Sequence, residues 1–544
     1  MYKKKALVSG LLVCSLALVA CGNGGSEGGK AKSKADASIE VNKEGFPITK
    51  DKLSMGMIAP GTGLAEWSDM PMLKEYAKMT NIDFKYTTPP LSDFSTKLNL
   101  AFASGDLPDI IFGAGSTNLT RAMEVDYGGQ GILVPLEDLI PEYAPNLNKV
   151  LEENPEIKKS ITSVDGHIYS LPTIGMGDTS IWPRGPLWYN GDWLKALDVK
   201  ELPKSVDEFY DLLVRFRDED PNGNGKKDEI PLTDVEMNSS RDWLLSAFGL
   251  TTQGIEEIDG KVQFNPTTEN YKAYLTFMNK LYKEKLLDPE VYSQADEQKK
   301  AKGNNNQLGL FPDWFSYFTT GKNEEESLTD PMFGPLTSEY SKDPVVPGSP
   351  RLTTGVFAVT NNAKSPEAAL RWVDYFYTEE GLTFLNQGPE GALWEYAEND
   401  KGEKVRVYAK GIDLDKTEDE RGKITVDYGI PVPAKQVSIP GIKRDPNDPD
   451  TFPFEEFIKK ETQDKIEPYA KVPFPIVYLT KEEQDQIGDM ATDLTTYVEQ
   501  MEAKFITGVE SLDNWDNFIK TIESMGVKDY VKVYQQAYDR WSDA

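Results

Sequence analysis

Short apolar runs alternate with stretches of helical spacing along the chain after residue 52. Leu53–Ala59, Ile82–Tyr86 and Ile110–Phe112 are brief and mostly apolar, as buried strands are. Between them, Met70–Met79 and Phe94–Ala103 place apolar side chains on one helical face. Strands that alternate with helices of this length predict βαβ units and a mostly parallel sheet.

A second region of the same α/β type extends from about Ile181 to Pro335. After it, Thr354–Thr360 predicts a strand that returns toward the first region. The C-terminal stretch, Lys481–Trp541, has mainly helical spacing. We find no internal repeat, and the length suits two or three lobes of ordinary size.

The helix predicted after the returning strand has signals at both ends. Ser365–Glu367 supplies an N-cap, a proline at the first helical position and an acid in the first turn. Apolar residues then recur at helical spacing at Ala369, Trp372, Val373 and Phe376. We expect Gly381 to end this helix.

The N-terminus has the features of a secretory signal. Lys3–Lys5 precede an apolar run, Ala6–Ala20, that is shorter than the roughly 20 residues of a membrane-spanning helix. The run ends in Leu18-Val19-Ala20-Cys21, which resembles the lipobox of bacterial lipoproteins. The resemblance implies removal of residues 1–20 as a signal peptide and lipidation of the Cys21 thiol. A signal-peptide cysteine without lipid is the alternative.

Residues 21–50 then form the lipidated cysteine and a tether, rich in Gly, Ser, Ala and Lys at its start. Two or more acyl chains, such as palmitate, anchor a protein stably. We therefore expect a lipoprotein on the extracellular face of the cell membrane, of the Gram-positive type.

The charge balance narrows the possible partners and chemistry. The chain has 59 Lys and Arg against 89 Asp and Glu, a formal net charge of −30. Nucleic acid is not expected as a partner, because phosphate binding needs a basic surface. One histidine and two cysteines argue against zinc hydrolases, Ser-His-Asp catalysis and a disulfide framework. We expect the histidine, His167, in the turn of a hairpin.

The segment Asp220–Pro231 (DPNGNGKKDEIP) carries oxygen-bearing residues at alternate positions, as a calcium loop does. Gly225 is at the sixth position, where an EF-hand needs glycine. Pro231 is at the twelfth, so we expect Glu229 to replace the usual bidentate glutamate. The predicted ligands of a structural calcium ion are Asp220, Asn222, Asn224, the Lys226 carbonyl, Asp228 and Glu229. A solvated Asn-Gly turn without metal is the alternative.

A helix is predicted to lead into this loop. Ser205 and Glu208 have the spacing of a capping box. The buried face is expected to comprise Val206, Phe209, Leu213 and Phe216.

Several of these segments, with others along the chain, resemble the large bacterial extracellular solute-binding proteins of family 1, the carbohydrate-uptake lipoproteins of ABC importers. The resemblance is carried by Leu100–Ile110, Asp192–Leu194 with Pro203 and Asp207–Phe209, Ser365–Ala369, Gly388–Gly391 with Trp394, Lys504–Gly508, Asn514-Trp515 and Tyr538. In one place the chain departs from the family. Tyr189–Gly191 stands where relatives often carry Arg before Asp-Trp-Leu, so the ligand here is expected to be less anionic.

The resemblance implies two α/β lobes joined by hinge segments, with a ligand cleft between them and each lobe discontinuous in sequence. We expect lobe 1 to comprise residues 51–172 and 345–410, and lobe 2 residues 173–344 and 411–544, including the calcium loop. The implied function is to capture an oligosaccharide and deliver it to permease subunits that work with a cytoplasmic ATPase. We expect a monomer that is not an enzyme.

A sugar site needs flat aromatic surfaces and planar polar side chains. The candidates in loops or beside turns are Trp67, Trp182, Arg184, Trp188, Trp243, Trp314 and Trp394, with Asp106, Glu390 and Glu395 as polar contacts. Phe311–Trp314 looks the most exposed. For each tryptophan, core packing is the competing interpretation, and we favour it for Trp193, Trp372 and Trp515.

Two other classes of function stay open. A peptide-binding or metal-binding lipoprotein fits the same anchor and size. A glycosidase or polysaccharide lyase could use a pair of carboxylates, although no motif selects one.

Overall fold

The computed structural model describes residues 38–449 and 452–543, and its largest sheet has six strands. In sheet order these are β14 (Lys435–Gln436), β4 (Leu171–Gly175), β11 (Leu352–Val359), β3 (Ile110–Phe112), β1 (Leu53–Ile58) and β2 (Ile82–Thr87). β1 is parallel to β2 and β3, whereas β11 is antiparallel to β3 and β4. The four strands predicted for this region are confirmed.

Helices pack on both faces of this sheet, because successive strand residues point to opposite sides. Phe112 packs into one core with α1 (Pro71–Thr80) and α14 (Pro366–Asp374), and Ile111 packs on the other face against α2 (Phe94–Ser104). Both helices predicted between the strands are confirmed. The other helices here are α3 (Arg121–Gly129), α4 (Ile140–Tyr143), α5 (Pro145–Glu153), α6 (Pro155–Ile161) and α16 (Thr417–Ile424).

The helix after Ser365 begins as predicted but ends earlier. The Ser365 hydroxyl accepts a hydrogen bond from the backbone N–H of Ala368 (3.2 Å). α14 then stops at Asp374, and Gly381 lies inside the next helix, α15 (Glu379–Gln387), so the prediction that Gly381 ends the element is wrong. A Cβ on Gly381 would overlap the carbonyl of Tyr375. The glycine therefore allows the new helix to pack closely on the preceding turn.

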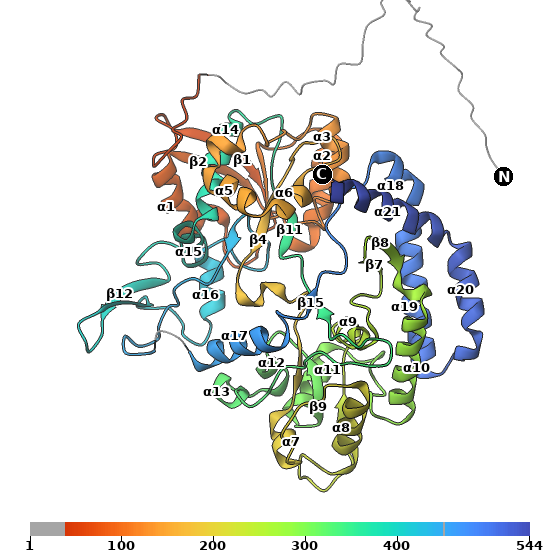
Figure 1. The fold of residues 1–544 in the computed structure, drawn as a ribbon. Coiled ribbons are helices and arrows are strands. Elements are labelled where there is room, and N and C mark those ends of the chain that lie inside the picture. Colours follow the sequence, from red (N-terminus) through yellow and green to blue (C-terminus); the bar gives the residue numbers. More distant parts are fainter. Residues whose placement is uncertain (1–37, 450–451, 544) are drawn as a thin grey trace, which may run out of the picture.

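A second sheet has three strands in the order β5 (Leu187–Tyr189), β9 (Leu308–Pro312) and β6 (Ile230–Leu232). β6 is parallel to β9, and β5 is antiparallel to it. The helices near this sheet are α7 (Gly191–Ala196), α8 (Val206–Asp218), α9 (Arg241–Leu245), α10 (Glu269–Lys283), α11 (Asp296–Asn304), α12 (Ser316–Thr320), α13 (Glu324–Ser327) and α17 (Pro453–Lys465). They form the lower part of the molecule in Figure 1.

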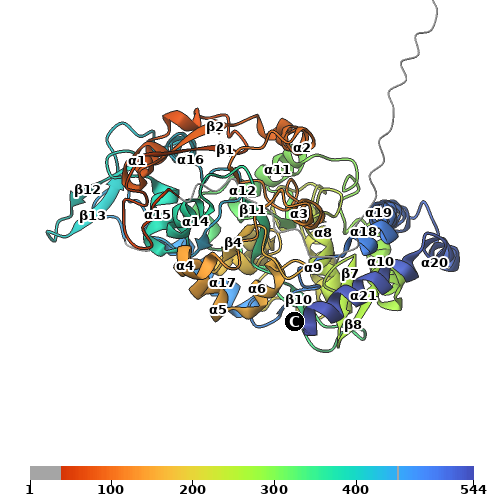
Figure 2. The ribbon, with the colours of Figure 1, turned by 90° about the horizontal axis from the view of Figure 1, so that it is seen from above.

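The C-terminal region is helical, as predicted. α18 (Lys481–Ile487), α19 (Met490–Thr507), α20 (Trp515–Ser524) and α21 (Val527–Asp543) form the blue layer beside the hairpin of β7 (Ile255–Ile258) and β8 (Lys261–Phe264) in Figures 1 and 2. Two further strand pairs are β12 (Trp394–Glu398) with β13 (Lys404–Tyr408), and β10 (Val346–Pro347) with β15 (Ala470–Lys471). No helix in the described ranges is long and apolar enough to cross a membrane.

Only half of the predicted capping box forms at the start of α8. Ser205 accepts a hydrogen bond from the N–H of Glu208 (3.3 Å), as expected. The Glu208 carboxylate, however, accepts from the N–H of Lys204 (2.8 Å) and not from that of Ser205. Phe209, Leu213 and Phe216 are fully buried, and Val206 is half-buried.

The two sheets belong to two separate hydrophobic cores. One core takes buried residues from 48–174 and 357–434, and the other from 182–346 and 454–533. The prediction that the chain changes lobe near Gly411 is wrong, because Val432 and Ala434 are buried in the first core and β14 pairs with β4. The chain stays with the first lobe beyond Gln436, because Ile439 packs against the first core and the N–H of Lys443 donates to the carbonyl of Arg406, and it reaches the second core at Phe454.

Three segments of the chain lie side by side where the two lobes meet. The N–H of Gly175 donates to the carbonyl of Arg351 (2.7 Å), and that of Met176 donates to the carbonyl of Gln436 (2.7 Å). A little farther along, the N–H of Ser349 donates to the carbonyl of Ile181 (2.8 Å). The two cores are thus joined by a narrow bundle of backbone.

Candidate ligand-binding site

The carboxyl ends of β6 and β9 meet at one edge of the second sheet, because these strands are parallel. Thr233-Asp234 follows β6, and Asp313-Trp314 follows β9. β5 is antiparallel and starts at the same edge, so the segment Trp182–Pro186 arrives there directly from the crossing. In α/β sheets, ligands bind outside the carboxyl ends of the strands.

Two predicted tryptophans lie together at this edge. The Trp314 side chain is 51% exposed, whereas Trp182 is 3% exposed, and their ring centroids are 6.2 Å apart in a stacked arrangement. Phe318, on α12, is a further exposed ring (49%). The buried Trp182 Nε1 has no hydrogen-bond partner. The edge therefore presents an exposed aromatic face with a second ring behind it.

Arg184 reaches the same edge through a close contact between two turns. Its guanidinium donates a hydrogen bond to the carbonyl of Asn238, in the loop that follows β6. At the next position, a Cβ on Gly185 would overlap the backbone of Asp313. A glycine is therefore required for the segment before β5 to pack against the turn that carries Trp314.

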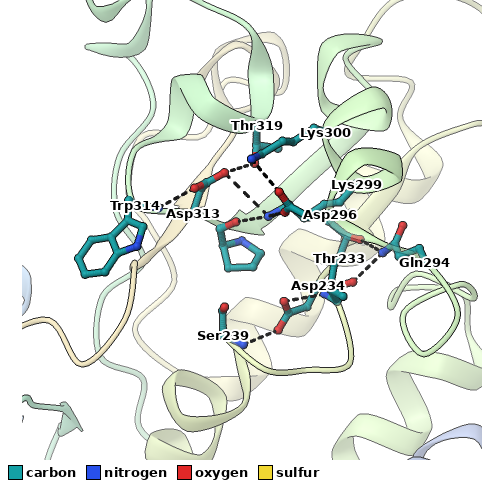
Figure 3. A network of polar contacts seen from close by, with 12 residues as sticks. Thr233, Asp234, Ser239, Gln294, Asp296, Lys299, Lys300, Asp313, Trp314 and Thr319 are labelled. Atoms are coloured by element: carbon teal, nitrogen blue, oxygen red, sulfur yellow. Dashed lines mark hydrogen bonds and ion pairs between the residues drawn. The ribbon is translucent and has the colours of Figure 1, made fainter. Parts of the chain in front are cut away.

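The turn at Asp313 is held by a polar network (Figure 3). The Asp313 carboxylate accepts hydrogen bonds from the N–H of Trp314 (2.8 Å) and from the hydroxyl of Thr319 (2.8 Å). Lys299, which is buried, donates to the carbonyl of Pro312 (2.9 Å), and its Nζ lies 3.9 Å from the Asp313 carboxylate. Trp314 is thus mounted on a fixed turn while its ring stays exposed.

The loop after β6 is organised in the same way. The buried Asp234 carboxylate accepts hydrogen bonds from the N–H groups of Ser239 (3.1 Å) and Ser240 (2.8 Å). Gln294 donates to the hydroxyl of Thr233 (3.0 Å) and to the carbonyl of Asp234 (2.6 Å). These bonds fix the loop after β6 (Figure 3). The carbonyl of Asn238 in this loop accepts the hydrogen bond from Arg184.

The remaining predicted tryptophans lie in cores. Trp188 is fully buried beneath the site, and its Nε1 donates to the carbonyl of Asp313 (2.9 Å). Trp243 is buried in the second core, and Trp67 in the first. For these three residues the competing interpretation is correct, because each side chain packs in a core. Trp193, Trp372 and Trp515 are also buried in cores, as we favoured.

Glu390 and Trp394 lie at another place, beside the β12–β13 hairpin. With Arg406 they line a hollow of about 670 Å³, and the Arg406 guanidinium sits 4.1 Å from the centre of the Trp394 ring. The Trp394 Nε1 donates to the carbonyl of Gly388 (3.1 Å). Glu395 is exposed. The structure does not bring this group together with Trp314.

Asp106 lies at the edge of the first sheet that faces away from the crossings. It precedes β3, so it is at the amino end of that strand, whereas the chain crosses from the carboxyl end of the parallel strand β4. Asp106 therefore lies apart from Trp314, and its contact with a ligand stays a prediction. His167 follows the turn at Val164-Asp165 that connects α6 to β4, so the prediction that it lies in the turn of a hairpin is wrong. Its Nδ1 is 2.5 Å from the Glu137 carboxylate, which raises the histidine pKa.

The predicted calcium loop folds as a tight turn after α8. Gly225 has the left-handed conformation (φ 72°), and its N–H donates to the Asp220 carboxylate (3.1 Å). The Asp228 carboxylate accepts hydrogen bonds from the side-chain amides of Asn222 (3.2 Å) and Asn224 (3.0 Å). The side-chain amide oxygen of Asn224 accepts a hydrogen bond from the backbone N–H of Lys226 (2.7 Å).

The electrostatics of this loop fit a cation. The hydrogen bonds to Asp228, led by that of Asn224, lower its pKa. Burial raises the pKa of Glu229, and the charges of Asp228 and Asp220 add to this. The Glu229 Oε1 is buried without a hydrogen-bond partner. Even so, no three His, Cys, Asp or Glu side chains within residues 38–449 and 452–543 converge closely enough to hold a metal ion.

Sequence reasoning missed Phe318, the loop at Asn238 and the role of Lys299. A signal was available for the loop, because Thr233-Asp234 directly follows a strand that pairs in parallel with β9. Nothing in the local sequence marks Lys299, which reaches the site from α11.

Residues 61–383 match the family described as bacterial extracellular solute-binding protein. The fructooligosaccharide ABC transporter substrate-binding protein FusA of Streptococcus pneumoniae is 30% identical over 98% of this chain and 97% of its own length. The chain belongs to this family. As a solute-binding protein of the extracellular type, it acts outside the cytoplasm.

A solved structure of FusA and one further relative agree with this assignment. The structure of S. pneumoniae FusA in complex with kestose has a TM-score of 0.69 and 26% identity, covering 90% of this chain and 99% of that one. The polygalacturonan/rhamnogalacturonan-binding protein YtcQ of Bacillus subtilis is 24% identical over 86% of this chain and 87% of its own. The solute-binding protein thus has the two-lobed α/β fold that we expected.

Proposed function

We propose that this solute-binding protein captures an oligosaccharide between its two lobes and delivers it to the permease subunits of an ABC importer. The observation that carries the proposal is the half-exposed Trp314 ring, stacked over Trp182 at the sheet edge where the lobes are joined. An aromatic face binds the apolar C–H face of a sugar ring. The Arg184 guanidinium supplies hydrogen-bond donors at the same edge.

FusA supports a neutral fructose-containing oligosaccharide as the first ligand to test, because it is similar over nearly the whole chain and was solved with kestose. Kestose should bind saturably in a calorimetric titration of the purified protein and should be recovered uncleaved. Peptides should produce no heat. A protein that binds peptides but none of a broad panel of oligosaccharides would refute the proposal, as would recovery of hydrolysed sugar.

The proposal includes a structural calcium ion held by the loop at Asp220–Glu229. Three carboxylates and the buried, unpartnered Glu229 Oε1 are compatible with a dication. One solved structure of FusA is described as an EF-hand mutant in complex with fructo-nystose; its TM-score is 0.69, its identity is 26%, and it covers 90% of this chain and 99% of that one. An ion here would fix the end of α8 and the start of β6, and so the strand whose carboxyl end reaches the site.

The proposal also includes a lipid anchor at Cys21. Cys21 and residues 22–37 lie outside the described residues, so lipidation and attachment to the cell surface rest on the lipobox resemblance alone. The prediction that the tether extends to residue 50 is wrong, because Ile48 is buried in the first core. We assign lobe 1 to residues up to about 175 together with residues 351 to about 448, and lobe 2 to the remainder of the folded chain.

A further inference from the structure

A cavity of about 470 Å³ lies where the C-terminal helix of the second lobe touches the first lobe. It is lined by Pro155, Lys158, Lys159, Thr162, Ser163, Val164 and Gly166 of lobe 1, and by Tyr478, Ala537, Arg540 and Trp541 of lobe 2. The C-terminus lies beside α6 in both Figures 1 and 2. The cavity is separate from the edge that carries Trp314 and lies within the usual size range of ligand pockets.

The walls are basic in a strongly acidic protein. Three of the lining residues are cationic and none is Asp or Glu, although the net charge is −30. By contrast, four glutamates and one arginine line the hollow beside Trp394. A local reversal of charge of this kind attracts anions.

Lys158 and Lys159 supply positive charge to the cavity, and the Lys159 ammonium also donates a hydrogen bond to the carbonyl of Ser542 (3.4 Å). Among the described residues, no carboxylate lies within ion-pair distance of either ammonium group. The charge of Arg540 is already paired, because its guanidinium forms an ion pair with Glu483 (2.7 Å) and donates to the carbonyl of Tyr478 (3.1 Å). Arg540 therefore shapes the wall, and the two lysines supply the charge.

A hydroxyl and an aromatic ring complete the cavity. Ser163 is 5% exposed, and its Oγ has no hydrogen-bond partner among the described residues. The Trp541 ring is held by a bond from its Nε1 to the Ser160 hydroxyl (3.3 Å), and the Lys159 ammonium lies 5.8 Å from the ring centre. An unpaired buried hydroxyl costs free energy that a ligand oxygen would recover.

We propose that this cavity binds a small organic anion, a phosphate or carboxylate carried on a ring. The anionic group would meet the two lysines and the Ser163 hydroxyl, and the ring would lie against Trp541. Because α6 belongs to one lobe and α21 to the other, the bound anion stabilises the present arrangement of the lobes. If the proposed function holds, the anion and the oligosaccharide therefore alter each other's affinity by the same factor.

Direct titration tests the site without reference to the oligosaccharide. Glucose 6-phosphate, glucuronate, inorganic phosphate and glucose are titrated by calorimetry into the purified protein. We expect saturable binding of at least one ring-borne anion, more weakly of inorganic phosphate, and none of glucose at the same concentration. Lys158→Ala/Lys159→Ala should weaken that binding at least tenfold.

The matched control is Lys200→Ala/Lys204→Ala, which removes the same charge from two lysines that are 78% and 77% exposed on another surface; it should bind as the unaltered protein does. Trp541→Ala should weaken the ring-borne anion more than inorganic phosphate. The proposal is overturned if neither ring-borne anion saturates, if glucose binds equally well, or if the Lys158/Lys159 variant keeps full affinity. A failed kestose titration would leave these outcomes unchanged, so the two proposals fail separately.

Discussion

At the scale of single residues, chemically identical side chains have different roles because the backbone exposes them differently. Trp314 lies two residues after the end of the central strand β9 and is half exposed. Trp188 lies within the edge strand β5 of the same sheet and is fully buried. The Trp188 Nε1 bonds to the backbone of the very turn that carries Trp314. One ring is therefore available to a ligand, and the other supports it.

Trp314→Ala should weaken kestose binding by about 10- to 100-fold, the equivalent of the roughly 1–3 kcal/mol lost with one stacked ring in complexes with bases. Calorimetric titration measures the change. Tyr340→Ala, which removes a ring that is 43% exposed elsewhere on the second lobe, is the control and should bind normally. Unaltered affinity in the Trp314 variant would remove this residue from the site.

Calcium binding at the loop Asp220–Glu229 can also be tested by substituting a single residue. Adding calcium should raise the melting temperature, because an ion that binds only the folded chain stabilises it, by about 2.7 kcal/mol at 100 times its Kd. Asp220→Ala should abolish the response, whereas Asp211→Ala, an exposed acid on the preceding helix, should keep it. Melting curves that coincide with and without chelator, together with no metal in the purified protein, would contradict the site.

At the scale of elements, one buried carboxylate joins three segments across the lobes. Glu124 on α3 accepts hydrogen bonds from Ser170, just before β4, and from Tyr478, after β15 (both 2.9 Å). Its Oε1 has no hydrogen-bond partner. Burial raises the pKa of Glu124 to about 7, although both hydrogen bonds and the charge of Arg121 act in the opposite direction.

This raised pKa predicts a pH dependence of stability. The folded chain binds the Glu124 proton more tightly than the unfolded chain, so stability from this group is complete below pH 4.5 and falls as the pH rises toward about 7. The loss is about 3 kcal/mol at 1.36 kcal/mol per pKa unit. Glu124→Gln should lose less stability between pH 5 and pH 8 than the unaltered protein in urea unfolding. Glu156→Gln, an exposed control, should follow the unaltered protein, and parallel pH profiles for all three would refute the assignment.

At the scale of the whole molecule, the proposed function requires the two lobes to move relative to one another. Closure over a ligand is a population shift, so the closed form must bind the sugar more tightly than the open form. Saturating kestose should reduce the radius of gyration in X-ray scattering and change tryptophan emission, since Trp314 would lose its contact with water. Identical scattering curves with and without bound sugar would exclude closure.

The anchor is the second property of the whole molecule. Cys21→Ala should release the protein to the medium or leave an unprocessed precursor, because no thiol remains to take the lipid. Fatty-acid labelling of cells that express each form measures this. Equal labelling of both forms would show that Cys21 is not the modified residue.

The sequence by itself determined the features that depend on neighbours along the chain. The predicted strands near Leu53, Ile82, Ile110 and Thr354 form as expected, and the helix cap at Ser365 does too, because apolar periodicity and capping act over a few residues. The family resemblance likewise rested on local motifs, and the match over residues 61–383 confirms it.

Only the tertiary structure decided which of these elements meet. It placed Asp106 at the far edge of its sheet, kept the chain with the first lobe past Gly411 as far as Lys443, and left Trp314 exposed while it buried Trp67 and Trp243. Strand direction, lobe crossings and side-chain burial depend on contacts between residues hundreds of positions apart. No local pattern encodes such contacts, which is why the candidate site and the basic cavity at the lobe junction became visible only in three dimensions.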